Sequence, residues 1–165
     1  MRLLILFVGC AFLAGGSKAQ YPPSLATPRE LGELVFSAIV NDDRAAYVAL
    51  VMTDADCDSA CARAHASDSA KAEVVEQMRG LARHVRGEAN AVFDTLRMKG
   101  MQYGVEWATA QLIEVRYEIK DRNGVEQADV LLVCERNTRP FAVFLNNCLR
   151  GMAWRILDTA QLKTQ

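Results

Sequence analysis

The hydrophobic period of the chain changes near Trp107, and this change constrains the fold more than any other feature. Before it, apolar residues recur every three to four positions, as they do on one face of a helix. After it, they alternate with polar residues, as in a strand with one buried face. A chain that places helices first and strands afterwards is expected to fold as an α+β domain.

The dipeptide Asn123-Gly124 defines the first hairpin of the strand region. Asn-Gly between two alternating runs is the strongest short-range signal for a two-residue hairpin turn. Such a turn predicts four cross-strand pairs: Ile119 with Ala128, Tyr117 with Val130, Val115 with Leu132 and Ile113 with Cys134. Because every pair is apolar, the register agrees with one buried face. Turns at residues 137–140 and 149–151 extend this hairpin into a four-stranded antiparallel meander.

Two helices are predicted at the start of the domain. The first begins after Thr27, because Thr27 is a good cap, Pro28 suits the first helical position and Glu30 completes a capping box. Residues 41–43 (NDD) end it and start a second helix, which carries Tyr47 on its apolar side.

A third, long helix begins at Ser67 or Asp68 and ends at Lys99-Gly100. Gly80 and Gly87 weaken it without interrupting its apolar seam. The seam consists of Val74, Met78, Leu81, Val85, Ala89, Val92 and Leu96. The predicted architecture is therefore three N-terminal helices packed on a curved, four-stranded antiparallel sheet.

Residues 1–19 have the pattern of a secretory signal peptide. A positive residue at the start is followed by an uncharged apolar run to Ala14, and Ser17 and Ala19 place small residues before the cleavage point. The run is shorter than the ~20 residues that span a bilayer. Cleavage near Ala19 is the leading interpretation, with a lipid anchor at Cys10 or an uncleaved anchor as alternatives. We expect a periplasmic or secreted protein without a membrane span.

The rest of the chain is predicted to hold one domain, at residues 27–158. Residues 20–26 form an extended lead-in and residues 159–165 a polar tail. Without Arg2 and Lys18, 17 basic and 20 acidic residues remain, for a net charge of −3. This balance offers no basic surplus for nucleic acid or anionic lipid.

The segment at residues 53–65 (TDADCDSACARAH) is the one stretch that concentrates metal-ligating and reactive side chains: three acids, two cysteines and a histidine. A calcium loop needs Gly at its sixth position and Glu at its twelfth, where the chain has Ser59 and His65. A zinc site could use Cys57, Cys61 and His65, which share one helical face. Zinc sites usually draw ligands from two separated pairs, however, and an oxidising compartment competes for the thiols. We predict neither a metal site nor a cofactor.

Four cysteines follow the predicted signal peptide: Cys57, Cys61, Cys134 and Cys148. An even number in an exported chain favours disulfides, and a local Cys57–Cys61 bridge is the leading pairing. The strand register places Cys134 several residues from the cross-strand partner of Cys148, beyond the ~7 Å that a disulfide allows. Cys134 is therefore expected to be a buried free thiol. The connectivity stays open.

Three stretches resemble nuclear transport factor 2-like (SnoaL-like) domains. They are residues 27–31 (TPREL), 35–43 (VFSAIVNDD) and 147–158 (NCLRGMAWRILD), which are similar to the first helix, the turn after it and the last hairpin of such domains. The resemblance covers residues 27–158 in element order and is closest to small exported members of the superfamily. It implies a strongly curved sheet that wraps around the helices as a cone, whose mouth holds an apolar ligand or a catalytic acid.

The resemblance implies a ligand cavity lined by Tyr47, Ile113, Val115, Tyr117, Val130 and Leu132. Enzymes of the superfamily place acids or histidines inside the cone, and this lining has neither. We therefore expect a non-catalytic binding or accessory domain for a small apolar ligand or a protein partner, with a possible homodimer through the sheet. One alternative is an interaction or immunity-type inhibitor that uses the acidic segment 54–58. The other is a cone isomerase or hydrolase, which requires Asp94 or His84 to face the cavity.

Overall fold

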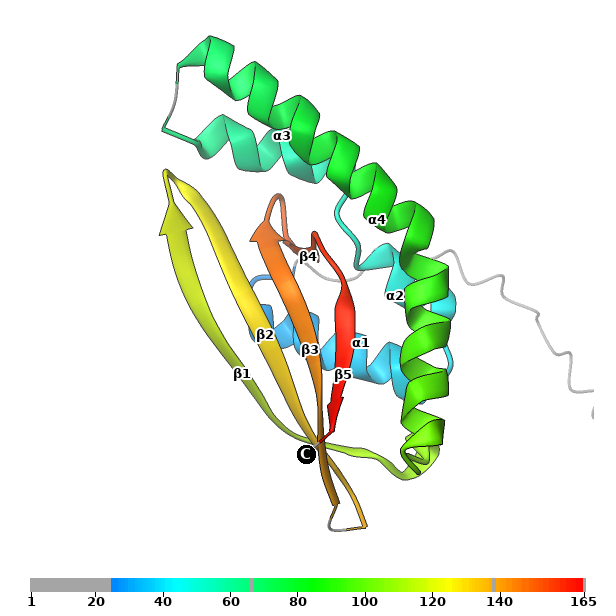
Figure 1. The fold of residues 1–165 in the computed structure, drawn as a ribbon. Helices are drawn as coiled ribbons and strands as arrows, with labels where there is room; N and C mark the ends of the chain where they lie inside the picture. The colour runs from blue at the N-terminus through cyan, green and yellow to red at the C-terminus, as the bar shows by residue number, and fades with distance from the viewer. Residues whose placement is uncertain (1–24, 66, 138, 165) are drawn as a thin grey trace, which may run out of the picture.

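The computed structural model describes residues 25–65, 67–137 and 139–164 (Figure 1). Helices occupy the first part of the described chain and an antiparallel sheet the second. The predicted α+β class is thereby confirmed. The predicted signal peptide and most of the predicted lead-in lie outside the described residues.

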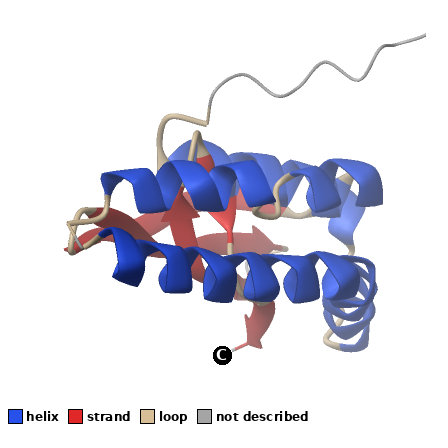
Figure 2. Ribbon diagram, turned by 90° about the horizontal axis from the view of Figure 1, so that it is seen from above, coloured by secondary structure: helices blue, strands red, loops and turns tan. Residues whose placement is uncertain are grey.

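Among the described residues, four α-helices precede the sheet: α1 (Pro28–Val40), α2 (Arg44–Ala49), α3 (Asp54–Arg63) and α4 (Asp68–Gln102). Thr27 caps α1 as predicted, because its side chain accepts from the Glu30 amide while the Glu30 carboxylate accepts from the Thr27 amide. Helix α3 is the one that the sequence analysis missed. It lies in the segment that lacks an apolar stripe, and α3 and α4 pack side by side beyond one end of the sheet (Figure 2).

The apolar seam predicted for α4 is only partly buried. Val85, Ala89 and Leu96 face the core, whereas Val74 and Leu81 are 42% and 40% exposed. Ala82 and Phe93 are buried beside the seam instead. The first part of this 35-residue helix extends past the end of the sheet (Figure 1) and packs against α3 instead, so part of the seam stays in solvent.

The sheet contains β1 (Gln111–Arg122), β2 (Val125–Arg136), β3 (Arg139–Arg150), β4 (Trp154–Ile156) and β5 (Ala160–Thr164). The strand order is β1-β2-β3-β4, and β5 also pairs with β3. Trp107 begins a short 3-10 helix, η1 (Trp107–Thr109), rather than the first strand. The region predicted as a polar tail forms β5, because Ala160 and Leu162 lie opposite Leu145 and Val143 and pack on the core.

The hairpin register is confirmed for three of the four predicted pairs. Ile119 lies opposite Ala128, Tyr117 opposite Val130 and Val115 opposite Leu132. Asn123 and Gly124 have φ values of 57° and 84°, as a type I′ turn requires. The fourth pair is wrong: the register shifts between Leu112 and Glu114, so Leu112 faces Cys134. The extra residue of this bulge is Ile113, which is 58% exposed.

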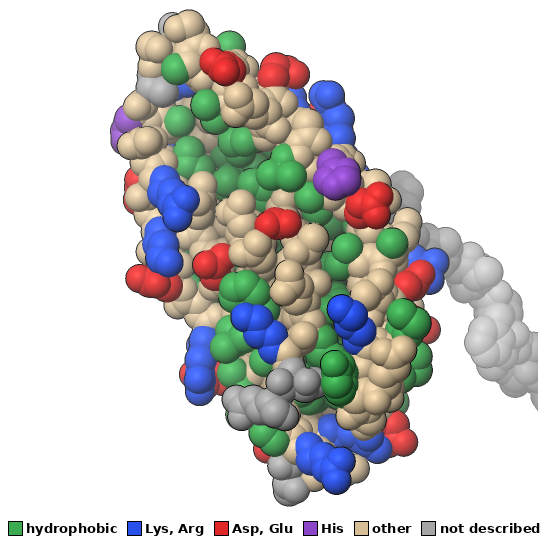
Figure 3. All heavy atoms as spheres, viewed as in Figure 1, with side chains coloured by type: hydrophobic (Ala, Val, Ile, Leu, Met, Phe, Trp, Pro, Cys, Tyr) green, Lys and Arg blue, Asp and Glu red, His purple; other side chains and the backbone are tan. Residues whose placement is uncertain are grey.

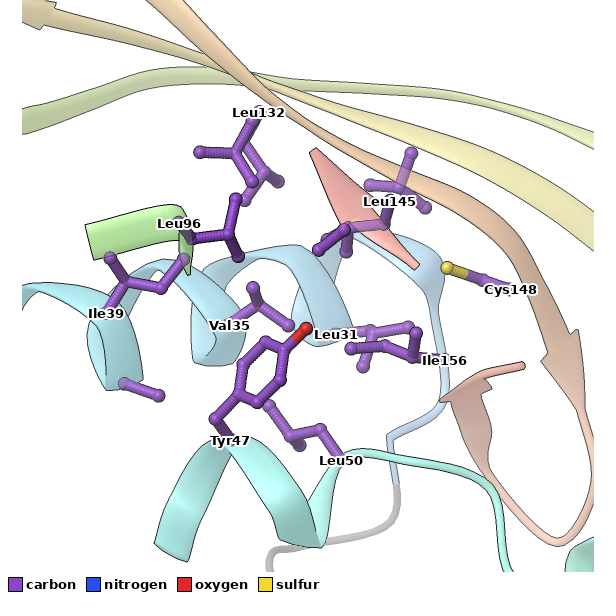
Figure 4. Close-up of a cluster of buried hydrophobic side chains, with 14 of the residues drawn as sticks. Leu31, Val35, Ile39, Tyr47, Leu50, Leu96, Leu132, Leu145, Cys148 and Ile156 are labelled. Carbon is purple, nitrogen blue, oxygen red and sulfur yellow. The ribbon is translucent and has the colours of Figure 1, made fainter. Parts of the chain in front are cut away.

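The core lies between the sheet and α1, α2 and α4. Tyr47 projects from α2 into a cluster that includes Leu31, Val35, Leu132 and Leu145 (Figure 4). Helix α1 approaches the sheet closely at Gly32, where an added Cβ would stand 2.7 Å from Leu132 Cδ2. A second apolar cluster joins α3 and α4 to the hairpin ends; it contains Met52, Cys57, Ala60, Ala82, Val125, Leu149 and Leu157.

Candidate functional site

Four of the six predicted cavity residues are packed into the core. Tyr47, Val115, Val130 and Leu132 are each at most 4% exposed and touch the helices that fill the inner face of the sheet. The other two, Ile113 and Tyr117, lie exposed on β1. Neither of the two hollows described below is lined by any of the six. Neither of these two hollows therefore brings the six residues together.

Tyr47 has a structural role in this arrangement. Its ring packs against Phe93 with 5.4 Å between the ring centroids, and its hydroxyl points into the apolar cluster (Figure 4). Burial raises the pKa of this hydroxyl, and the nearby Cys148 adds to the rise. The phenol is therefore neutral at physiological pH.

The acidic segment at residues 53–65 has a structural role at the start of α3. Thr53 caps α3, and its amide and hydroxyl donate to Asp56 Oδ2 at 3.1 and 2.6 Å. Asp56 is 1% exposed, and Arg155 Nε lies 3.6 Å from the same oxygen. The capping box satisfies Asp56 Oδ2 and the cation balances its charge, whereas Asp56 Oδ1 is buried without a hydrogen-bond partner among the described residues.

The other two acids of the segment pair with arginines of α4. Asp54 lies 3.1 Å from Arg83, and Asp58 lies 2.6 Å from Arg79. The inhibitor hypothesis requires an exposed acidic loop with unpaired carboxylates. Here the segment is helical, and arginines of α4 neutralise the charges of Asp54 and Asp58. Arg79 also lies 2.5 Å from Glu76 of its own helix, so Arg79, Glu76 and Asp58 form a small charge network that links α3 to α4.

The predicted disulfides are not formed: Cys57, Cys61, Cys134 and Cys148 are all buried free thiols. The local pair fails because α3 is a continuous helix, in which residues four apart hold their Cβ atoms ~5–6 Å apart. A disulfide needs ~3.5–4.5 Å between those atoms. Cys61 instead contacts Met78 of α4, with 3.4 Å between the sulfur atoms.

The register separates the other two thiols. Cys134 lies opposite Phe141, and Cys148 lies opposite Ala128. Burial raises the pKa of Cys57 to about 11 and that of Cys134 to about 12, and it also raises the pKa of Cys61 and Cys148. Within the described residues, no three His, Cys, Asp or Glu side chains gather as they would around a metal ion.

Neither residue named for the enzyme hypothesis faces the core. Asp94 is half exposed and pairs with Arg44 at 2.6 Å. His84 is exposed on α4. Their positions give no acid or base to an interior cavity, and the condition set for the isomerase or hydrolase alternative is not met.

The larger of the two hollows, here called the arginine hollow, has a volume of about 720 Å³. It lies where the end of α4 meets the β2–β3 turn, and basic side chains gather at that lower end of the molecule (Figure 3). The residues that line it are Tyr103, Gly104, Val105, Arg136, Asn137, Arg139, Pro140 and Phe141.

The walls of the arginine hollow are fixed by the chain itself. Gly104, at φ 76°, ends α4 in a Schellman motif, with Val105 N donating to Gly100 O at 2.8 Å. Arg136 donates to Gly104 O and lies 2.9 Å from Glu106. Phe141 packs edge-on against Trp107, with 5.6 Å between the ring centroids.

The Arg139 side chain differs from that of Arg136 in having no hydrogen-bond or ion-pair partner among the described residues. Sequence reasoning treated residues 137–140 as a turn and missed this site. The available signal was the pair of arginines that flank the turn, but Tyr103 and Gly104, which complete the lining, lie more than 30 residues earlier in the sequence.

The smaller, polar hollow has a volume of about 280 Å³ and lies over the bulge between β2 and β3. Asp129 accepts from the Asn147 amide at 3.0 Å, and Asp158 accepts from the Asn146 side chain at 2.6 Å. Asn147 has a φ of 52°, which Asn tolerates better than most residues. The Asp129 carboxylate therefore holds the irregular backbone in place, and the Asp158 carboxylate fixes the Asn146 side chain beside it.

Comparison with known proteins adds no relative to this description. No protein-family model matches the chain, and neither a curated protein nor a solved structure does. Among the described residues, no helix is both long enough and apolar enough to cross a membrane.

Proposed function

We propose that the protein is a small binding domain whose ligand is a compact organic anion, held in the arginine hollow. The observation that carries this proposal is the lining itself. It combines two arginines with Tyr103, Val105 and Phe141 in a volume of about 720 Å³. Small-molecule sites commonly have volumes of ~300–1,000 Å³ and apolar walls with a few placed polar groups.

The two arginines suit different tasks in such a site. Arg136 is held by Gly104 O and Glu106, so its position is set before a ligand arrives. Arg139 is exposed and has no acidic partner among the described residues. An arginine without a partner favours a carboxylate, which it binds through two parallel hydrogen bonds. The apolar walls favour a ligand with a hydrocarbon or aromatic body.

The proposed role is binding rather than catalysis. Among the lining residues there is no His, Cys, Asp or Glu, which are the usual groups for proton transfer or nucleophilic attack near neutral pH. Membership of the nuclear transport factor 2-like superfamily and export through residues 1–19 remain proposals. The order of helices followed by an antiparallel meander supports the first, and the pattern of the N-terminal residues supports the second.

Thermal denaturation with three probes tests the proposal. Benzoate should raise the Tm in a concentration-dependent way, because a ligand that binds the native state alone stabilises it by mass action. Benzyl alcohol, which is similar in shape but neutral, should not. Arg139→Gln should abolish the benzoate shift, whereas Arg122→Gln, a matched change outside this hollow, should keep it.

The third probe, acetate, separates the contribution of the apolar walls from that of charge. Acetate should give a smaller shift than benzoate, since it leaves the walls unfilled. Absence of any benzoate shift, or an equal shift in Arg139→Gln, would contradict the proposal.

A further inference from the structure

Strand β1 leaves one of its edges open. It is a terminal strand of the sheet, and in the described residues only β2 pairs with it. The pair that flanks a two-residue hairpin turn is normally hydrogen bonded, and here that pair is Arg122 and Val125. The backbone N–H and C=O groups of every second residue back from Arg122, such as Lys120 and Glu118, then point to β2. The backbone groups of Val115, Tyr117 and Ile119 therefore point to the open edge.

The open edge also carries exposed apolar side chains. Tyr117 is 39% exposed and Ile119 is 46% exposed, although their partners Val130 and Ala128 are buried. Both lie on the inner face of the sheet, near its edge. Open edges with apolar residues are templates for pairing with another strand.

The opposite face of β1 carries four charged residues in alternation: Glu114, Arg116, Glu118 and Lys120. Acidic and basic side chains follow one another down the left edge of the molecule, where β1 lies (Figure 3). Arg116 lies 2.8 Å from Glu114 and Lys120 lies 3.4 Å from Glu118, so these side chains share one face.

This order of charges is complementary to itself when the strand is reversed. A two-fold axis at Tyr117 places Arg116 opposite Glu118 of a second copy, and Glu114 opposite Lys120. On the inner face the same axis places Tyr117 opposite Tyr117, and Val115 opposite Ile119. Opposite charges and apolar pairs directly across an antiparallel ladder are both stabilising.

Neighbouring registers lack this complementarity. An axis at Arg116 places that residue opposite its own copy, and Glu114 opposite Glu118. An axis at Glu118 places two glutamates together, and Arg116 opposite Lys120. Like charges directly opposite one another are destabilising, so only one of the three registers is favoured on both faces.

We infer that a second copy of this chain pairs with β1 in an antiparallel manner, with the two-fold axis at Tyr117, to form a continuous sheet across the dimer. The interface is isologous and closed, because each β1 contributes the same surface and no open edge remains between the copies. The inference is independent of the arginine hollow, which lies at the end of α4.

Sedimentation equilibrium of the purified full-length protein tests the register. The wild type should form dimers in a concentration-dependent way. Arg116→Glu should weaken dimerisation about tenfold or more, because it replaces two symmetric attractive pairs with two repulsive ones. The double variant with Arg116→Glu and Glu118→Arg should restore dimerisation, since opposite charges again meet across the axis.

The double variant places like charges next to one another along each single strand, so its recovery reports pairing between copies and not stability of the monomer. Arg29→Glu, an exposed reversal on α1, is the control and should dimerise as the wild type does. A wild type that stays monomeric at millimolar concentration overturns the inference. So does a double variant that is no better than Arg116→Glu.

Discussion

Gly151 lies against the backbone of Asp56, and this contact ties the β3–β4 turn to the first turn of α3. A Cβ added at residue 151 would stand 2.5 Å from Asp56 Cβ and 2.7 Å from Asp56 O. Arg63 strengthens the same contact by donating to the carbonyl oxygen atoms of Arg150 and Gly151. The position therefore requires glycine for space.

We predict that Gly151→Ala destabilises the protein by about 1–3 kcal/mol or more, because backbone atoms must shift to admit the methyl group. The matched control is Gly80→Ala. Gly80 is exposed on α4 with nothing within 4 Å of an added Cβ, so this change should stabilise the protein by up to ~1 kcal/mol. Urea denaturation of the two variants measures both effects. Equal free energies of unfolding for the two variants would refute the conclusion that position 151 requires glycine for space.

Helices α1 and α3 begin with the same device in different surroundings. Each has a threonine cap and an acidic residue three positions later that bonds back to the cap. Glu30 is exposed, whereas Asp56 is buried and also faces Arg155. The same side-chain deletion should therefore have unequal consequences.

We predict that Thr27→Ala costs about 0.5–2 kcal/mol, the usual range for loss of a cap. Thr53→Ala should cost more, because it also leaves a buried carboxylate with one donor fewer. Chemical denaturation of the two variants, followed by far-UV circular dichroism, gives the comparison. A smaller loss for Thr53→Ala would argue against a structural role for the acidic segment.

At the scale of the whole molecule, the four buried thiols are divided between two parts of the fold: Cys57 and Cys61 lie in α3, and Cys134 and Cys148 lie in the sheet. Burial raises the pKa of each thiol above its unfolded value of about 8.5. Between that value and the folded pKa values, the unfolded chain has lost protons that the native protein still holds. Linkage then requires the free energy of unfolding to fall as pH rises.

We predict that the titration of these thiols leaves the free energy of unfolding unchanged below about pH 8 and lowers it from about pH 9 upwards. The Cys134→Ala variant should show a shallower decline than the wild type, as measured by urea denaturation across the alkaline range. The four thiols should react with iodoacetamide only after unfolding. A native mass that is two hydrogens short would show a disulfide and contradict the free thiols.

The sequence by itself determined the elements whose signals are local. The Thr27 cap and the Asn123-Gly124 turn depend on residues within a few positions, and both were predicted correctly. The register from Val115 to Ile119 follows from that turn. The helix-to-strand order was likewise readable from the change of period at Trp107.

Only the tertiary structure decided which apolar residues are buried and where a hollow remains. Helix α3 has little apolar pattern and is held by α4 and Gly151, and β5 forms because β3 offers an edge beside the core. The predicted cavity lining is mostly core, since α1 approaches the sheet at Gly32. The arginine hollow joins Tyr103 to Arg139, which are far apart in sequence. Such contacts depend on packing between elements, which a local pattern does not specify.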